Sequence, residues 1–216
     1  MELNKKVFTK NIAGRDLKIE VSRLAAQTNA AVFATYGGTT VLVTTVMGKS
    51  DREIDYMPLT VDYEEKFYAA GKIIGSRFVR REGRPSEDAI LSGRLVDRSI
   101  RPLFDQKLRR DIQVVVTILS IDEVNEPDFI ALMAASIALG ISDIPWAGPI
   151  AGVKVAKIGD RIVINPSHVE TTDNPEVRFE SFVAGLNGKI NMIELEGNDA
   201  KEKEIVEAYA AALKEI

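Results

Sequence analysis

The chain contains no cysteine among its 216 residues, which excludes disulfide bonds and thiolate metal sites and fits a reducing compartment. No apolar stretch approaches the roughly 20 residues that a membrane-spanning helix needs. The N-terminal residues MELNKKVFTKN contain no apolar signal core. The single histidine, His168, follows Pro166-Ser167, and we interpret it as a surface loop residue. We therefore expect a cytoplasmic protein without contact to a membrane.

Lysine is absent between Lys72 and Lys107, whereas seven arginines lie between Arg77 and Arg101. A guanidinium group is planar and makes two-point contacts with phosphate, which an ammonium group cannot do. The net charge of −4 argues against a chain that coats nucleic acid non-specifically. Any contact with nucleic acid must therefore be local, and the arginine stretch offers such a site.

The arginine stretch divides into a loop and a helix. Gly71, Gly75 and Gly83 predict a flexible first half. That half carries Phe78, Arg80, Arg81 and Arg84. The sequence Pro85-Ser86-Glu87-Asp88 then has the composition of a helix start, with a capping hydroxyl and acids in the first turn.

On a helix that ends near residue 101, Arg94, Arg98 and Arg101 fall within about 60° of one another. The opposite side carries Ala89, Val96, Ile100 and Leu103. The helix can therefore offer an apolar side to a core and a row of guanidinium groups to phosphate. The alternative is a solvated surface on which the arginines pair with Glu87 and Asp97.

The remaining pattern predicts an α+β fold in which mixed β-sheets pack with helices. Strands are expected at 17–21, 31–35, 39–46, near 57–61, and at 112–119, the last as a central strand. An apolar, buried helix is expected over 128–141. Two hairpins follow, formed by 150–157 with 161–164 and by 179–184 with 190–195, and then a charged helix over 199–216.

Several segments carry a resemblance to a known family. They are the stretch from Phe78 to Glu87 (FVRREGRPSE), the stretch from Arg94 to Phe104 (RLVDRSIRPLF), DYEEK at 62–66, YAAGKI at 68–73 and IPWAGPI at 144–150. Together they resemble the first ribonuclease PH-like domain of the bacterial polynucleotide phosphorylases. The similarity runs from about Val21 to about Leu186, which is most of the chain.

The resemblance implies that the chain is part of a 3′→5′ phosphorolytic exoribonuclease, a polyribonucleotide nucleotidyltransferase. Such an enzyme degrades single-stranded RNA with inorganic phosphate as co-substrate and releases nucleoside diphosphates. The family also implies Mg²⁺ bound by a second ribonuclease PH-like domain outside this chain, a homotrimer, and other RNA-degradation proteins as partners. Residues 1–200 would form one ribonuclease PH-like domain. Residues 201–216, which end within a helical pattern without a cap, would begin a helical segment that leads to the missing part.

The same resemblance assigns RNA binding to Phe78, Arg80, Arg81 and Arg84, because the family has a basic, aromatic loop at the mouth of its pore. Phe78 would stack on a base and the arginines would bind phosphates. The family usually has a second aromatic residue where Val79 stands. Arg94, Arg98 and Arg101 match family arginines on the next helix, and we expect them to bind phosphate.

The catalytic set of the family's second domain does not map onto this sequence. Its phosphate-binding serines fall at Glu126-Pro127-Asp128, where carboxylates would repel phosphate. Its two metal-binding aspartates fall at Asn174 and Glu180, and its lysine falls at Phe182. We therefore expect no catalytic residues and no metal site in this chain, so that it contributes RNA binding and trimer assembly and is inactive alone. Two alternatives remain: a non-catalytic RNA-binding ring subunit, and a free-standing ribonuclease PH-like enzyme.

Overall fold

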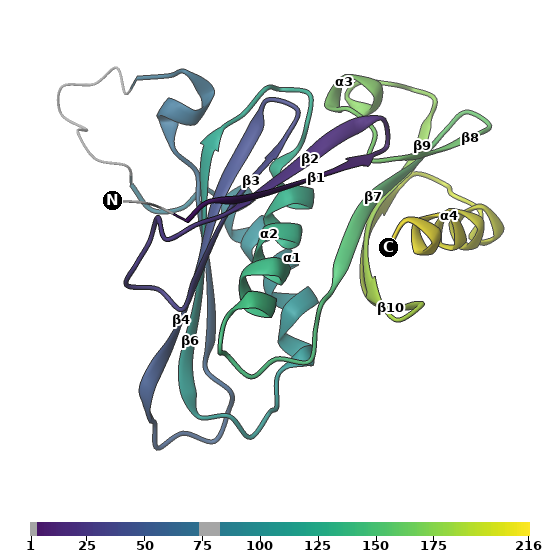
Figure 1. Cartoon of the computed structure of the whole chain (residues 1–216). Coiled ribbons are helices and arrows are strands. Elements are labelled where there is room, and N and C mark those ends of the chain that lie inside the picture. The colour runs from purple at the N-terminus through teal and green to yellow at the C-terminus, as the bar shows by residue number, and fades with distance from the viewer. Residues whose placement is uncertain (1–3, 74–82) are drawn as a thin grey trace. The chain divides into compact units, whose positions relative to one another are not determined.

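The computed structural model describes residues 4–73 and 83–216, and these residues divide into two compact units, 1–148 and 149–216. The first unit contains the strands β1 (Lys6–Ile12), β2 (Arg15–Val21), β3 (Ala30–Tyr36), β4 (Thr39–Asp51), β5 (Leu59–Glu64) and β6 (Arg110–Ser120). Its helices are α1 (Glu87–Ile100) and α2 (Pro127–Ile141), with the short 3₁₀ turns η1 (Phe67–Ala70) and η2 (Arg101–Leu103) (Figure 1).

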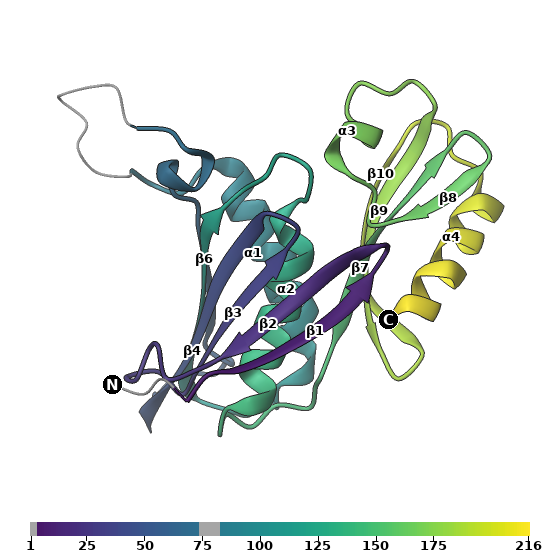
Figure 2. The same cartoon turned by 45° about the horizontal axis from the view of Figure 1, so that its top comes forward.

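The six strands of the first unit form one sheet in the order β1-β2-β3-β4-β6-β5. Figure 2 shows β1 to β4 side by side, as consecutive antiparallel neighbours. Only the β5–β6 pair is parallel among the described strands, because α1 lies between these two strands in the sequence and supplies the long connection that a parallel pair needs. The expected central strand is therefore confirmed as β6, which lies between β4 and β5.

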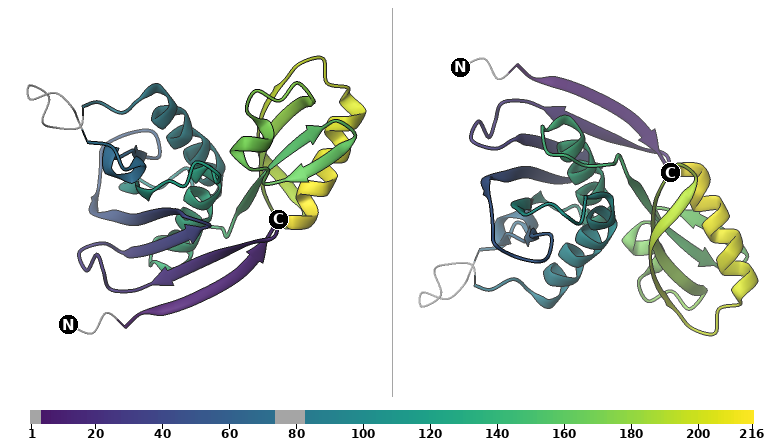
Figure 3. Two further views of the ribbon diagram at one scale, coloured as in Figure 1. Left: turned by 90° about the horizontal axis from the view of Figure 1, so that it is seen from above. Right: turned by 90° about the horizontal axis from the view of Figure 1, so that it is seen from below.

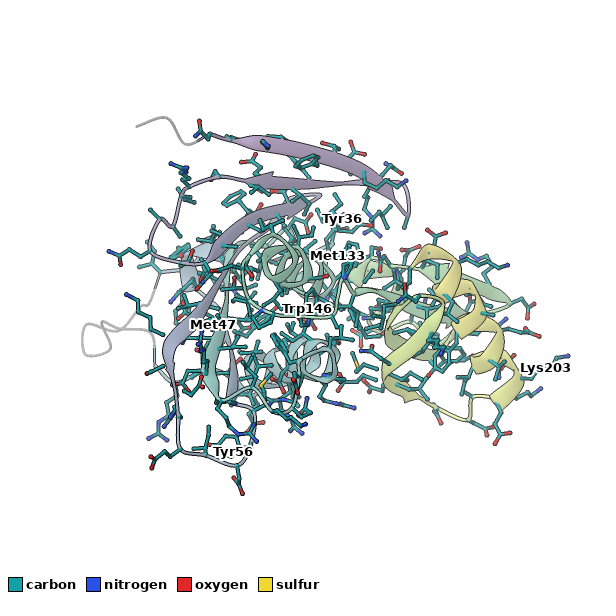
Figure 4. The ribbon with its side chains drawn as sticks, turned by 60° about the horizontal axis from the view of Figure 1, so that its bottom comes forward. Tyr36, Met47, Tyr56, Met133, Trp146 and Lys203 are labelled. Carbon is teal, nitrogen blue, oxygen red and sulfur yellow. The ribbon has the colours of Figure 1, made fainter. Side chains whose placement is uncertain are left out.

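Residues on β4 and β6 alternate between buried and partly exposed positions, because one face of the sheet packs on helices. Helix α2 lies against β3, β4 and β6, and α1 lies against β5 and α2. Figure 3 shows both helices on the same face of this sheet. Helix α2 buries nine residues, as its apolar sequence predicts. Tyr36 and Trp146 point into this unit (Figure 4).

The second unit contains β7 (Ala151–Ile158), β8 (Arg161–Ile164), α3 (His168–Thr171), β9 (Val177–Leu186), β10 (Lys189–Gly197) and α4 (Glu202–Glu215). Its four strands form an antiparallel sheet in the order β10-β9-β7-β8. Helix α4 packs on β7, β8 and β9 and buries Ala208 and Ala212, which lie one turn apart on one face. Both expected hairpins are confirmed.

Among the described elements, β1, η1, η2 and α3 were not predicted. Strand β1 carries no alternation that would mark it, because its side chains are nearly all exposed. The turns η1 and α3 are only four residues long. His168 is the first residue of α3 and is exposed. The expected boundary at residue 200 lies between β10 and α4, and the continuation of the chain beyond α4 stays a prediction.

Candidate RNA-binding surface

The predicted RNA-binding residues fall partly within the structure. Phe78, Arg80 and Arg81 lie outside the described residues, so their contact with RNA stays a prediction. Arg84 is described and exposed. The three arginines predicted to bind phosphate lie on α1 and at the turn that follows it, and the structure separates them into two kinds.

The start of α1 is fixed by Ser86. The Ser86 side chain accepts a hydrogen bond of 2.9 Å from the backbone N–H of Ala89, which caps the helix as the sequence predicts. The Ser86 hydroxyl also donates to the carboxylate of Glu65 at 2.7 Å. Glu87 and Asp88 occupy the first turn, where negative charge is favourable. The beginning of α1 is therefore tied to the segment that follows β5.

The two sides of α1 sort as expected. Ala89, Val96 and Ile100 are buried, whereas Arg94 and Arg98 are exposed. Gly93 faces β5, where an added Cβ would lie 3.5 Å from the carbonyl oxygen of Val61. Arg94 and Arg98 are both accessible from solvent, and Arg94 also lines the groove between α1 and β5. Both are placed to contact a phosphate that approaches from solvent.

Arg101 lies at the start of η2 and turns back onto the protein. Its Nε and Nη2 atoms donate to the two carboxylate oxygens of Asp97 at 2.9 and 2.7 Å. Nη2 also donates to the carbonyl oxygen of Leu59 at 3.0 Å, and Nη1 donates to that of Met57 at 3.4 Å. Arg101 therefore holds the end of α1 against the start of β5. Its predicted contact with phosphate would have to compete with these four hydrogen bonds.

A groove of about 400 Å³ runs between β5 and α1. Its charged lining includes Asp62, Glu64, Arg94, Asp97 and Arg101. Asp62 accepts a hydrogen bond of 2.7 Å from Gln113, and Glu64 forms an ion pair of 3.2 Å with Lys66. An anion inside the groove would meet carboxylates as well as Arg94. The outer surface of α1 is therefore better suited to phosphate than the groove itself.

The start of α2 carries a carboxylate, Asp128, that disfavours phosphate binding there. Asp128 lies in the first turn of α2, and its carboxylate accepts a hydrogen bond of 3.0 Å from the hydroxyl of Tyr63. Burial of Tyr63, and then the charge of Asp128, raise the pKa of the Tyr63 hydroxyl well above its usual value. Tyr63 therefore remains a neutral donor to Asp128. A second anion at this helix start would be repelled by the carboxylate.

Asn174 and Glu180, where the resemblance places the family's metal-binding aspartates, do not form a metal site. Glu180 makes an ion pair of 3.1 Å with Lys154, and Phe182 is buried. The Asn174 side chain accepts from the N–H of Glu176 and donates to the carbonyl oxygen of Glu170, which are turn contacts. Within residues 4–73 and 83–216, no group of three or more His, Cys, Asp or Glu side chains could hold a metal ion. The side chains at these three described positions are therefore not arranged to hold the Mg²⁺ that the family implies.

Asp122 joins two loops in a way that the sequence does not reveal. Its carboxylate accepts hydrogen bonds from the backbone of Gly38 at 2.7 Å and from the hydroxyl of Thr39 at 3.0 Å. It also accepts from the side chain and backbone N–H of Asn125 and the N–H of Val124. Burial raises the pKa of Asp122, but these hydrogen bonds outweigh burial and lower that pKa to about 2. In the sequence, Gly37-Gly38 indicates a turn but not the residue that contacts it.

None of the helices in the described part of the chain is long and apolar enough to cross a membrane.

The profile of domain 1 of the 3′ exoribonuclease family matches residues 13–145. The profile of domain 2 of the same family matches residues 148–215. These two ranges agree closely with the two compact units.

The chain is also similar to bacterial proteins named polyribonucleotide nucleotidyltransferase. It is 47% identical over 208 residues to the protein of Exiguobacterium sibiricum, covering 96% of this chain and 28% of that protein. It is 48% identical over 212 residues to the protein of Alkaliphilus oremlandii, covering 98% and 30%. The chain therefore spans less than a third of the length of these curated relatives.

Among solved structures, rice (Oryza sativa) Rrp46 has a TM-score of 0.67, with 99% of this chain and 91% of that chain covered. The two sequences are only 11% identical, so this likeness concerns the fold alone. It confirms the expected α+β ribonuclease PH-like fold. Because the domain 1 profile alone covers more than half of the sequence, the chain belongs to the 3′ exoribonuclease family.

Proposed function

We propose that this chain is the RNA-holding part of a phosphorolytic 3′→5′ exoribonuclease, a polyribonucleotide nucleotidyltransferase. The observation that carries the proposal is the outer surface of α1. There, Arg94 and Arg98 are exposed on a helix in a chain of the 3′ exoribonuclease family. The loop residues Phe78, Arg80 and Arg81, together with Arg84, would extend this contact along the strand. A cytoplasmic location belongs to the same proposal.

Phosphorolysis of RNA benefits from a surface that binds the RNA strand outside the reacting centre. In phosphorolysis, inorganic phosphate attacks the last phosphodiester of RNA, the bond to the preceding nucleotide breaks, and a nucleoside diphosphate leaves. The nucleophile is already an anion, so the main requirement is to hold two anions close and in line. Arginines outside the reacting centre contribute by keeping the RNA strand in place while its 3′ end is shortened.

We assign bond cleavage to a part of the longer relatives that this chain does not match. Asp128 closes the helix start at which phosphate would be bound, and Glu180 is paired with Lys154. Mg²⁺, which neutralises phosphate charge in such reactions, would then be held by residues outside this chain. Assembly as a homotrimer, and contact with other RNA-degradation proteins, are further parts of the proposal.

The assay is phosphate-dependent release of nucleoside diphosphates from poly(A), measured with this chain and with a full-length relative under the same conditions. We expect the full-length protein to release ADP and this chain to release almost none, although the chain still binds poly(A). Rapid release by the chain alone would favour the alternative of a free-standing enzyme. Absence of both release and RNA binding would contradict the proposal.

A further inference from the structure

Two neighbouring aromatic side chains on η1 are exposed and are not part of the arginine surface of α1. Phe67 is 50% exposed and Tyr68 is 58% exposed. Exposed aromatic rings forgo a large favourable burial energy. Two adjacent exposed rings therefore suggest that something covers them in the working protein.

The backbone beneath these rings is firmly held. Ala69, the next residue of η1, is buried, and its carbonyl oxygen accepts a hydrogen bond of 3.0 Å from the N–H of Ile121 at the end of β6. Gly71 ends the turn in the left-handed conformation, with a φ of 65°, and its N–H donates to the carbonyl oxygen of Tyr68 at 3.0 Å. The two rings are thus presented on a fixed turn, which reduces the entropy lost when a partner binds.

A lysine lies on each side of the two rings, and the Lys66 ammonium group is already paired with Glu64. Lys66 precedes them, and Lys72 follows, with the Lys72 N–H 3.0 Å from the carbonyl oxygen of Phe67. Of the two acids before the turn, Glu64 is paired with Lys66 at 3.2 Å, and Glu65 accepts the hydrogen bond from Ser86. Aromatic rings interleaved with cations are typical of surfaces that bind single-stranded nucleic acid through base stacking and phosphate contacts.

The segment that leads into η1 is bonded to the residue that caps α1. The 2.7 Å bond from Ser86 to Glu65 joins the N-terminus of α1 to the residue two places before Phe67. The outer surface of α1 and the η1 turn are therefore neighbouring parts of one unit. We propose that Phe67 and Tyr68 form a stacking platform that positions single-stranded RNA beside the arginines. This inference rests on the proposed function and adds two positioning residues to it.

The test is a fluorescence-anisotropy titration of the full chain with a fluorescein-labelled 20-nucleotide oligoadenylate, repeated at several salt concentrations. Phe67→Leu and Tyr68→Leu remove the flat ring but keep an apolar side chain. Each is expected to weaken binding about fivefold or more, the effect of losing one stacked base. The dependence of affinity on salt should stay unchanged, because the rings contact bases and not phosphates.

Two sets of controls accompany this test. Tyr56→Leu removes an equally exposed ring (60%) from the connection between β4 and β5, where Tyr56 points away from the sheet (Figure 4), and should leave binding unchanged. Phe67→Tyr and Tyr68→Phe keep the aromatic face and should bind as the unmodified chain does. Thermal unfolding followed by circular dichroism checks that each variant is folded.

Three outcomes would overturn the inference. Unchanged affinity of both leucine variants, with binding by the unmodified chain intact, would remove the platform and leave the proposed function standing. If the leucine variants bind RNA normally but differ from the unmodified chain in oligomeric state, measured by light scattering, a protein surface covers the rings instead. Absence of RNA binding by the unmodified chain would remove the proposed function and the platform together.

Discussion

The guanidinium group of Arg101 donates hydrogen bonds of 2.9 and 2.7 Å to the carboxylate of Asp97, one helical turn earlier. The same guanidinium reaches the carbonyl oxygens of Leu59 and Met57. Arg94 and Arg98 lie on the same helix but are exposed. Arg101 is therefore engaged within the fold, whereas Arg94 and Arg98 are accessible from solvent, and this difference can be measured by mutation.

Arg101→Ala should lower the free energy of unfolding by about 1–2 kcal/mol, because it removes charge-assisted hydrogen bonds and leaves Asp97 and a strand edge without their partner. The measurement is urea denaturation followed by circular dichroism. Arg98→Ala is the matched control and should change stability by no more than about 0.5 kcal/mol. Equal destabilisation by the two substitutions would contradict the assignment of Arg101 to the fold.

Arg94→Ala and Arg98→Ala should weaken binding to single-stranded RNA. Each should also reduce the slope of log affinity against log salt by about 0.7 for every phosphate that the variant no longer neutralises. Anisotropy titrations at several salt concentrations give both quantities. Lys203→Ala, on the exposed side of α4 (Figure 4), removes a cation elsewhere and should alter neither. An unchanged slope in both arginine variants would remove α1 from the RNA-binding surface.

Arg80→Ala combined with Arg81→Ala should weaken binding of single-stranded RNA by the full-length protein and reduce its salt dependence, because two guanidinium groups no longer neutralise phosphates. The same titration measures the effect. If the slope stays at the value of the unmodified protein, these two arginines do not contact phosphate.

Asp122 predicts a specific acid sensitivity. Its pKa is about 2 in the folded protein and about 3.9 in an unfolded chain. A lowered pKa contributes stability that is complete above the unfolded value and is lost as the pH falls from about 4 towards 2. Asp122→Asn should therefore cost about 1–2 kcal/mol at pH 7 and much less near pH 2. Urea denaturation at both pH values provides the comparison, and an equal loss at each would refute this role.

Gly38→Ala should destabilise the fold by about 1–3 kcal/mol, because the new methyl group would lie 2.8 Å from the Cβ of Asp122. Its control is Gly140→Ala in α2, where no atom lies within 4 Å of the added Cβ and the helix should gain slightly. Thermal unfolding of the two variants measures the contrast. A harmless Gly38→Ala would show that the packing between the two loops can relax.

Much of the fold could be predicted because its signals are local. The hydroxyl before α1 and the acids in its first turn predicted its start, and the apolar runs predicted β6 and α2. Asp122 could not be predicted, since its partners Gly38 and Thr39 lie 84 and 83 residues away in the sequence. The hydrogen bonds of Arg101 could not be predicted either, because helical periodicity places this residue in a row with Arg94 and Arg98. Periodicity does not reveal that α1 ends at Ile100 and that the next side chain folds back.

The carboxylate of Asp128 at the start of α2 has a consequence for how the protein would respond to its surroundings. Because the Asp128 carboxylate already interacts with the positive end of the helix dipole, a free phosphate at this helix start would be repelled. The start of α2 should therefore bind no free phosphate, whether the phosphate supply rises or falls. Under the proposed function, the attacking phosphate would have to be bound at a place other than the start of α2.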